Sequence, residues 1–346
     1  MTDDLRWSAR WIWAEGAPRG ARHVVALATS CDLAEVPTRV SARWCAVARA
    51  VVYVNGVEVG RGPVRSNPRR QPYEDLDLAP HLRAGTNHIA AIAVHYAGAT
   101  PWYLPMPPFS SDLADGAFVF EADLGADKLV SDDTWTAQVL DGWGATSGGG
   151  VAGRGVELID TRSLPADWAG AGLGGAVALR RATAVGEPGR STPPSYPVGP
   201  FGPRPIAPLT AEPVAFVDAG DGTWRHGAVV AGTLVVEVEG PDGAEATVRI
   251  AEMVDADGVP VPGEHDAALQ ITCDGSRRLV ESVDRFGGQG AVVDAADGVV
   301  VHTVGVVERL YPCAGDGGFA CSDPLLERIH RVGRRTVTLN SDDAYT

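Results

Sequence analysis

Strand-like patterns dominate the first three hundred residues of the chain. Short runs rich in Val, Ile and Ala are separated by Gly, Pro, Asn and Asp, as in HVVALATSCDL, ARAVVYVNGVEVG, NHIAAIAVHYAG and GAFVFEADLG. The dipeptide Asn55-Gly56 lies between two such runs, and it suits a type I′ turn because both central residues of that turn need positive φ. The pattern therefore predicts antiparallel hairpins, and we expect no helix of three turns before residue 180.

The strand pattern stops at residues 187–213, which are crowded with Pro and Gly. These residues disfavour both helices and hydrogen-bonded ladders, so we expect an extended linker or a strap on a domain surface. Strand-like runs then resume in GTLVVEVEG, EATVRIAEMV and GAVVDAADGVVVHTVGVVERLYP. Several such runs at short spacing predict a second sandwich.

A helical pattern appears only near the end of the sequence. Asp323 is suited to be an N-cap and Pro324 to be the first helical residue. Apolar or small side chains then recur at helical spacing over 324–339, at Leu325, Ile329, Val332 and Thr336. One helix cannot bury this stripe by itself, so partners for it are expected.

Together these patterns predict a mainly β fold with two antiparallel β-sandwich, jelly-roll-like domains. We expect the N-terminal sandwich over 1–182, a Pro/Gly-rich linker over 183–213, the second sandwich over 214–312 and the start of a helical domain over 313–346. A length of 346 residues is enough for two or three domains.

Charge, hydrophobic runs and cysteine content indicate which partners and which cellular location to expect. The chain has 44 acidic and 29 basic residues and a formal charge of −15, which argues against a nucleic-acid partner because a polyanion would be repelled. No apolar run approaches the roughly 20 residues needed to cross a bilayer, and the N-terminus lacks a signal-peptide pattern. The five cysteines are odd in number and widely scattered. We therefore expect no membrane partner and a reducing, cytoplasmic location.

Four arginines within ten residues form the first candidate binding feature, at Arg61, Arg65, Arg69 and Arg70. Guanidinium groups offer planar donors that could clamp an anionic or polyhydroxyl ligand. Equally, these arginines could form a solvated rim or pair with nearby acids, at Glu74, Asp75 and Asp77. The sequence leaves both interpretations open.

Two adjacent aromatic residues, Trp102 and Tyr103, form the second candidate feature. Their rings could stack on a sugar, because an aromatic ring combines an apolar face with a polar edge. They could also close the end of a sandwich core. The candidate carbohydrate-binding residues are thus Arg65, Arg70, Trp102 and Tyr103.

No pattern in the sequence indicates catalysis, a metal or a cofactor. The eight histidines lack metal-ligand spacing, and no G-x-S-x-G nucleophile motif occurs. Residues 254–263 have some acids of a calcium loop but lack its distal Glu, and the glycine-rich residues 148–155 lack the Lys of a phosphate-binding loop. We expect no catalytic residue, no metal site and no cofactor in this chain.

Four stretches resemble bacterial α-L-rhamnosidases of glycoside hydrolase family 78. Residues 53–98 resemble the N-terminal β-sandwich module of that family, and residues 156–168 look like the segment that ends this module. Residues 232–258 are similar to the next sandwich, and residues 317–346 resemble the entry into the catalytic (α/α)₆ barrel. The resemblance covers nearly the whole chain.

The resemblance implies that the chain is the non-catalytic N-terminal portion of an α-L-rhamnosidase, truncated before the barrel. In that family the Asp-Ala-Tyr motif is followed by the segments that carry the catalytic acid and base, whereas this sequence stops at Thr346. The helix over 324–339 would be the first barrel helix, with the rest of the barrel packing on Leu325, Ile329 and Val332. The complete enzyme would hydrolyse terminal α-L-rhamnose from a rhamnose-containing glycoside or oligosaccharide by inversion.

Two other functions stay open. The chain could be a freestanding carbohydrate-binding protein of two sandwiches, or a structural remnant without a ligand. The coding sequence directly after Thr346 separates these hypotheses from the enzyme, because only the enzyme requires several hundred further residues.

Overall fold

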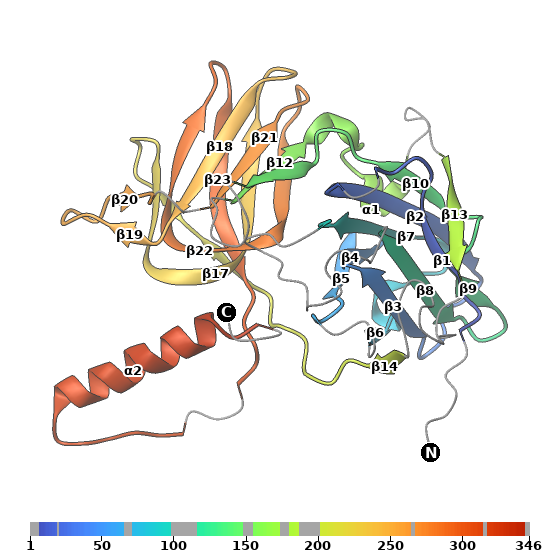
Figure 1. Cartoon of the computed structure of the whole chain (residues 1–346), viewed down its shortest axis with the longest axis horizontal. Coiled ribbons are helices and arrows are strands. Elements are labelled where there is room, and N and C mark those ends of the chain that lie inside the picture. The colour runs from blue at the N-terminus through green and yellow to red at the C-terminus, as the bar shows by residue number, and fades with distance from the viewer. Residues whose placement is uncertain are drawn as a thin grey trace. The chain divides into compact units, whose positions relative to one another are not determined.

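The computed structural model describes residues 7–18, 21–65, 71–97, 116–147, 155–173, 180–186, 201–263, 267–313 and 317–342. The chain divides into two compact units, of which the first contains residues 1–153 and 158–205 and the second contains residues 154–157 and 206–346. Both units consist mainly of strands (Figure 1), so the predicted mainly β fold is confirmed. None of the described helices is both long and apolar enough to span a bilayer.

Most strands of the first unit belong to one long sheet. Its order is β14-β6-β3-β8-β1-β13-β10-β2-β7-β4-β5, with β9 paired to β8. The elements over this part of the chain are β1 Trp11–Ala14, β2 His23–Leu33, β3 Ser41–Val47, β4 Arg49–Val54, β5 Val57–Gly62, β6 Gln71–Asp77, β7 Gly85–His95, β8 Ala117–Asp123, β9 Lys128–Val130, β10 Thr136–Val139, β11 Gly144–Ser147, β12 Gly155–Asp160, α1 Trp168–Ala171, β13 Arg180–Gly186 and β14 Phe201–Pro203.

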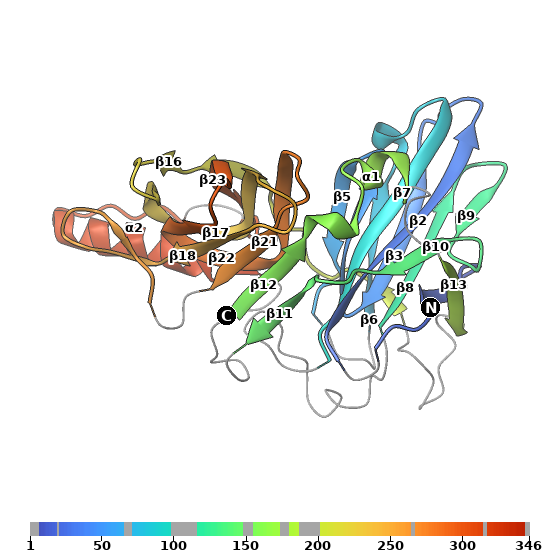
Figure 2. The same ribbon diagram turned by 90° about the horizontal axis from the view of Figure 1, so that it is seen from above.

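The first unit is a β-sandwich because this sheet folds back on itself at β13. That strand pairs with β1 on one side and with β10 on the other, and so joins two groups of strands (Figure 2). Side chains from both groups fill one hydrophobic core, in which the largest fully buried residues include Trp44, Phe118, Phe120, Leu27, Ile89 and Trp135. Burying large apolar side chains in this way is the main force that stabilises the sandwich.

The predicted turn at Asn55-Gly56 joins β4 to β5. Asn55 has φ of 51° and Gly56 has φ of 84°, and Val54 pairs with Val57 across the turn. Both central residues thus have the positive φ of a type I′ turn, as predicted. Asn55 also holds neighbouring loops, because its amide donates to the His81 carbonyl over 2.9 Å and its oxygen accepts from the His88 amide over 3.0 Å.

A buried carboxylate, Glu121 on β8, holds the segment just before β1 in place. It accepts hydrogen bonds from the backbone amides of Ser8 and Ala9 at 2.6 and 3.1 Å, and it pairs with Arg43 at 3.0 Å and Lys128 at 3.4 Å. Burial alone would raise the pKa of Glu121, but the amide donors and the two positive charges outweigh it and hold the pKa below the ordinary value.

This environment predicts an acid-sensitive first unit. Because the pKa of Glu121 is lower in the folded state, its ionised form adds stability above pH about 4.5, and this contribution is lost as the pH falls through the folded pKa. Glu121→Gln should lower the free energy of unfolding at pH 7 and flatten its decline as the pH falls below the ordinary pKa of a glutamate. Urea unfolding followed by Trp fluorescence can measure this, because eight of the nine tryptophans belong to the first unit, and Trp224 alone belongs to the second.

The exposed Glu15 provides the control for this experiment. Glu15→Gln should leave the free energy of unfolding at pH 7 close to that of the wild type, because substitutions of exposed side chains change it by about 0.5 kcal/mol or less. An unchanged pH profile in Glu121→Gln would contradict the prediction.

The second unit is built around two long strands, β17 and β22. The strands run in the order β12-β21-β18-β22-β17-β23-β15, and β16 pairs with β17. Its elements are β15 Glu212–Ala215, β16 Val217–Asp218, β17 Thr223–Glu239, β18 Glu245–Ala251, β19 Met253–Val254, β20 Pro260–Val261, β21 Ala268–Thr272, β22 Arg278–Ala295, β23 Val300–Glu308 and α2 Pro324–Leu339.

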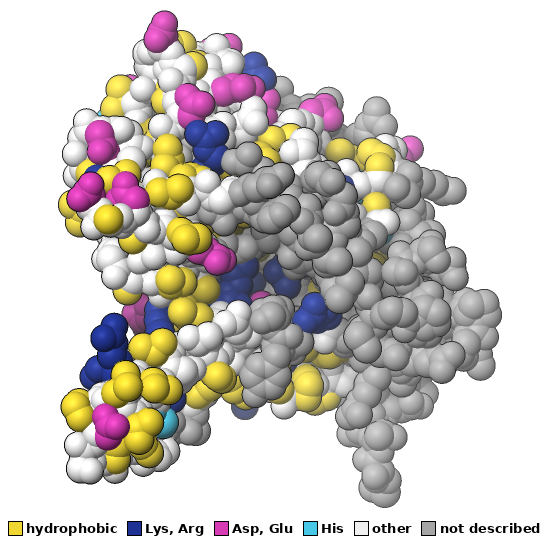
Figure 3. All heavy atoms as spheres, turned by 60° about the vertical axis from the view of Figure 1, so that its left-hand side comes forward, with side chains coloured by type: hydrophobic (Ala, Val, Ile, Leu, Met, Phe, Trp, Pro, Cys, Tyr) yellow, Lys and Arg dark blue, Asp and Glu magenta, His cyan; other side chains and the backbone are white. Residues whose placement is uncertain are grey.

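The predicted C-terminal helix is confirmed as α2. It begins at Pro324, after the N-cap Asp323, whose carboxylate accepts a hydrogen bond from the Leu325 amide over 2.8 Å. No residue of α2 is buried, and Leu325, Ile329 and Val332 are 60%, 57% and 56% exposed. Figure 3 shows hydrophobic and basic side chains gathered on this helix. Within the described part of the chain, the apolar stripe therefore faces solvent.

Candidate functional site

The structure describes only one of the four predicted sugar-binding residues. Arg70, Trp102 and Tyr103 lie outside the described residues, while Arg65 follows β5 and is partly buried. The structure thus shows the surroundings of Arg65, but it does not test whether the four residues come together.

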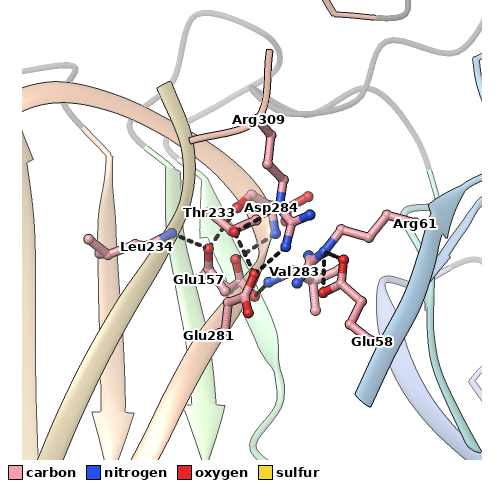
Figure 4. Close-up of polar contacts among 10 residues, drawn as sticks. Glu58, Arg61, Glu157, Thr233, Leu234, Glu281, Val283, Asp284 and Arg309 are labelled. Atoms are coloured by element: carbon pink, nitrogen blue, oxygen red, sulfur yellow. Dashed lines mark hydrogen bonds and ion pairs between the residues drawn. The ribbon is translucent and has the colours of Figure 1, made fainter. Parts of the chain in front are cut away.

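The neighbouring Arg61 makes an ion pair within its own strand. Its guanidinium donates to the Glu58 carboxylate over 3.0 Å, and both side chains are largely buried (Figure 4). An ion pair was one of the two interpretations of the arginine cluster, but the sequence pointed to Glu74, Asp75 or Asp77 as the acid. Arg61 therefore supports β5 itself.

Glu74 on β6 organises the backbone just before Arg65. Its carboxylate accepts from the Val64 amide over 3.1 Å and from Arg204 over 2.7 Å, and the residue is 8% exposed. A Cβ at Gly62 would lie 2.4 Å from the Glu74 carboxylate, so only glycine fits there. Glu74 therefore fixes the path of the backbone at the end of β5, and with it the position of the Arg65 backbone.

Arg204 comes from a short segment that we name the strap, residues 201–205. The strap contains β14, which pairs in parallel with β6, and Phe201 stacks on Trp11 with ring centroids 5.6 Å apart. Part of the Pro/Gly-rich region is therefore a strand on the first unit. The strap and Glu74 place a charged, hydrogen-bonded pair beside the Val64 amide.

A second polar cluster lies in the second unit, around a bulge in β22 (Figure 4). Thr233 pairs with Arg285 and Val235 with Glu281, so residues 282–284 stand opposite Leu234 alone. Such an insertion leaves backbone groups without ladder partners. These groups need other partners because the bulge is buried.

Glu157 and Ser282 provide those partners. The two oxygens of Glu157 accept from the amides of Val283 at 2.8 Å and Asp284 at 3.0 Å. The Ser282 hydroxyl accepts from the Leu234 amide at 2.9 Å and donates to the Asp284 carbonyl at 2.7 Å. Glu157 is 2% exposed, and its two hydrogen bonds stabilise the backbone of the bulge.

The Glu281 carboxylate also accepts hydrogen bonds from neighbouring side chains. It accepts from Arg309 over 2.7 Å and from the Thr233 hydroxyl, and Arg309 also donates to Thr233 over 3.0 Å. Among the described residues, no group of three or more His, Cys, Asp or Glu side chains is placed to hold a metal ion.

Sequence reasoning missed Glu157 and Arg204. In β12 the residues alternate between buried and partly exposed, and Glu157 lies on the buried phase together with Gly155 and Ile159. The opposite phase carries Val156 and Leu158, so hydrophobicity alone could not show which face is inward. The one sequence feature that could have identified Glu157 is an acidic residue flanked by apolar residues in a strand. Arg204 lies in a Pro-rich segment, and no local sequence pattern there indicates its role.

Comparison with known proteins shows the fold. No protein-family model and no curated protein matches the chain. Among solved structures, the GH78 family rhamnosidase of Bacillus sp. GL1 matches with a TM-score of 0.80 at 16% identity, over 99% of this chain and 59% of that one. The α-L-rhamnosidase from Dictyoglumus thermophilum matches with a TM-score of 0.70 at 16% identity, over 98% and 40%.

A third similar structure is the Streptomyces avermitilis α-L-rhamnosidase complexed with L-rhamnose, with a TM-score of 0.70 at 17% identity, over 94% of this chain and 32% of that one. The chain thus spans 32–59% of the length of these three enzymes. At such identities the likeness concerns the fold. This chain has the β-domain fold found in the α-L-rhamnosidases of glycoside hydrolase family 78, over part of their length.

Proposed function

We propose that this chain forms the non-catalytic β domains of an α-L-rhamnosidase-like glycoside hydrolase. The complete protein would remove terminal α-L-rhamnose from glycosides by inversion, with one carboxyl group protonating the leaving oxygen and another activating water. The observation that carries the proposal is the match to the Bacillus enzyme, which covers 99% of this chain but 59% of that enzyme. Under this proposal the catalytic acid and base belong to residues beyond this sequence.

The exposed stripe of α2 supports the same proposal. Leu325, Ile329 and Val332 are each more than half exposed, and burying a large apolar side chain contributes about 1.5–3 kcal/mol. We propose that further helices of a catalytic barrel cover this stripe. A rhamnose-containing glycoside is the proposed substrate, since one of the similar enzymes holds L-rhamnose.

We expect the 346-residue chain to hydrolyse nothing, and a version extended by the residues encoded downstream to release the aryl group from an aryl α-L-rhamnoside. The reason is that inversion needs two carboxyl groups roughly 6.5–9.5 Å apart across the glycosidic bond, and we place both in the extension. The measurement is the initial rate of aryl-group release by each of the two proteins at equal concentration. Turnover by the short chain that disappears when one of its own carboxylates is replaced would overturn the proposal.

A binding measurement on the same short chain tests whether the first unit takes up sugar. Titration with L-rhamnose, monitored by Trp fluorescence, should show binding with a dissociation constant of about 1 mM, which corresponds to about −4 kcal/mol. Arg65→Ala should weaken this binding, and the matched variant Arg162→Ala, on an exposed arginine paired with Asp160, should not. Equal binding by all three proteins would remove Arg65 from the site.

A further inference from the structure

Three arginines from different elements lie where the C-terminal part of α2 meets the strands of the second unit. Arg335 of α2 pairs with Glu308 at the end of β23 and donates to the Val229 carbonyl of β17 over 2.9 Å. Arg309, which follows β23, is fixed by Glu281 and Thr233 in the cluster of Figure 4. The third arginine, Arg285 of β22, connects these parts.

Arg285 makes its contacts directly after the bulge. Its guanidinium donates to the Arg309 carbonyl over 2.8 Å and to the Leu339 carbonyl over 3.2 Å, and it lies 3.3 Å from the Asp342 carboxylate. Leu339 is the last residue of α2, where carbonyl groups lack intrahelical partners and a positive charge is favourable. One planar group therefore joins Arg309, directly after β23, to the end of α2 and to Asp342, three residues beyond that end.

The bulge determines where this guanidinium lies. A bulge changes the direction of the side chains next to it. The bulge in β22 is held by hydrogen bonds to Glu157 and Ser282, which are 2% and 0% exposed. Arg285 is itself mostly buried, with a side-chain exposure of 16%, while the first three turns of α2 are exposed. Among the described residues, the contacts that anchor α2 therefore lie at its C-terminal end.

We propose that the β22 bulge and Arg285 form a rigid joint that fixes the direction in which α2 leaves the second unit. The joint presents the apolar stripe of Leu325, Ile329 and Val332 on a helix whose orientation is set before any partner arrives. Pre-orientation lowers the entropy lost when such a helix docks. This assignment does not depend on the proposed rhamnosidase activity, because it concerns α2 and the second unit alone.

Spin-label distances test the direction of α2. One label goes on the native Cys321, just before the helix, and the other on Val300→Cys at the exposed start of β23, with Cys31 and Cys313 replaced by serine. We expect a narrow distance distribution in this background. Arg285→Gln should broaden it, whereas Arg278→Gln should not, because Arg278 lies on the same strand, is similarly buried and pairs with Asp274.

Hydrogen exchange of the same full-length variants tests the anchoring. Amides at 336–342 should exchange about tenfold faster or more in Arg285→Gln, since charged hydrogen bonds are lost there, and β17 and β22 should stay protected. Asp342→Asn, which keeps the carbonyl contacts of Arg285, should have a smaller effect. An unchanged distance distribution in a folded Arg285→Gln protein would contradict the proposal that Arg285 fixes the direction of α2.

Milder variants decide the question if Arg285→Gln unfolds the second unit. Arg285→Lys keeps the charge but loses the planar fork, and Asp342→Asn leaves Arg285 in place. Either one should still broaden the distance distribution relative to Arg278→Gln. Distributions as narrow as the background in both would refute the proposal.

Discussion

Glu157→Ala is expected to lower the free energy of unfolding of the second unit by about 3–5 kcal/mol. The carboxylate accepts from two buried amides, those of Val283 and Asp284, within a bulge where the register between β17 and β22 skips residues 282–284. Removing it takes this acceptor from both amides at once, and an unsatisfied buried polar group costs about 1–3 kcal/mol. Glu157→Gln keeps one acceptor oxygen and should lose roughly half as much.

Urea unfolding with pulsed hydrogen exchange, resolved by peptides of β18 and β22, measures this loss for the second unit separately. Glu237→Ala is the matched control, because Glu237 lies on β17 but its partner Arg277 is 53% exposed. Exposed pairs contribute about 0–1 kcal/mol, so the control should change little. A loss below about 1 kcal/mol in Glu157→Ala would show that the bulge finds other acceptors.

Glu74→Ala should destabilise the first unit by about 3–5 kcal/mol, more than Arg204→Met does. The two side chains lie 2.7 Å apart and are each 11% exposed, so the pair is shielded from water. Loss of Glu74 leaves the buried Arg204 charge and the Val64 amide without this acceptor, whereas loss of Arg204 leaves Glu74 with its amide donor. Breaking one side of a buried pair is costly for this reason.

A double-mutant cycle isolates the pair. The combined variant should lose less stability than the sum of the two single variants, by more than about 1 kcal/mol. Urea unfolding followed by Trp fluorescence reports on the first unit, and Arg162→Ala, an exposed arginine of the same unit, should change the midpoint little. Strictly additive losses would show that Glu74 and Arg204 do not interact energetically.

Features determined by neighbouring residues could be predicted from the sequence. The Asn55-Gly56 turn depends on the tolerance of two residues for positive φ, and the start of α2 depends on Asp323 and Pro324. Both are local effects, and both are found as predicted. The mainly β fold likewise follows from the repeated short apolar runs with turn residues between them.

Features determined by distant partners could not be predicted. The strap forms a parallel strand because β6 has an edge that accepts it and because Trp11 offers a face to Phe201. The Glu157 side chain points into the second unit because a backbone amide 126 positions later in the chain, that of Val283, needs a hydrogen-bond acceptor. For the predicted sugar site, Arg65 alone is placed, so Arg70, Trp102 and Tyr103 remain predictions.

Strand β12 has a consequence for the order of folding. Its residues 155–157 belong to the second unit and residues 158–160 to the first, and Glu157 contacts residues 126 and 127 positions further along the chain. During synthesis this strand emerges long before its partners and must wait for them, which raises the contact order and the loop-closure entropy of the second unit. A gene fragment that starts at residue 206 would lack this strand altogether. It would expose the edge of β21, its neighbour in the sheet, to pairing with other chains.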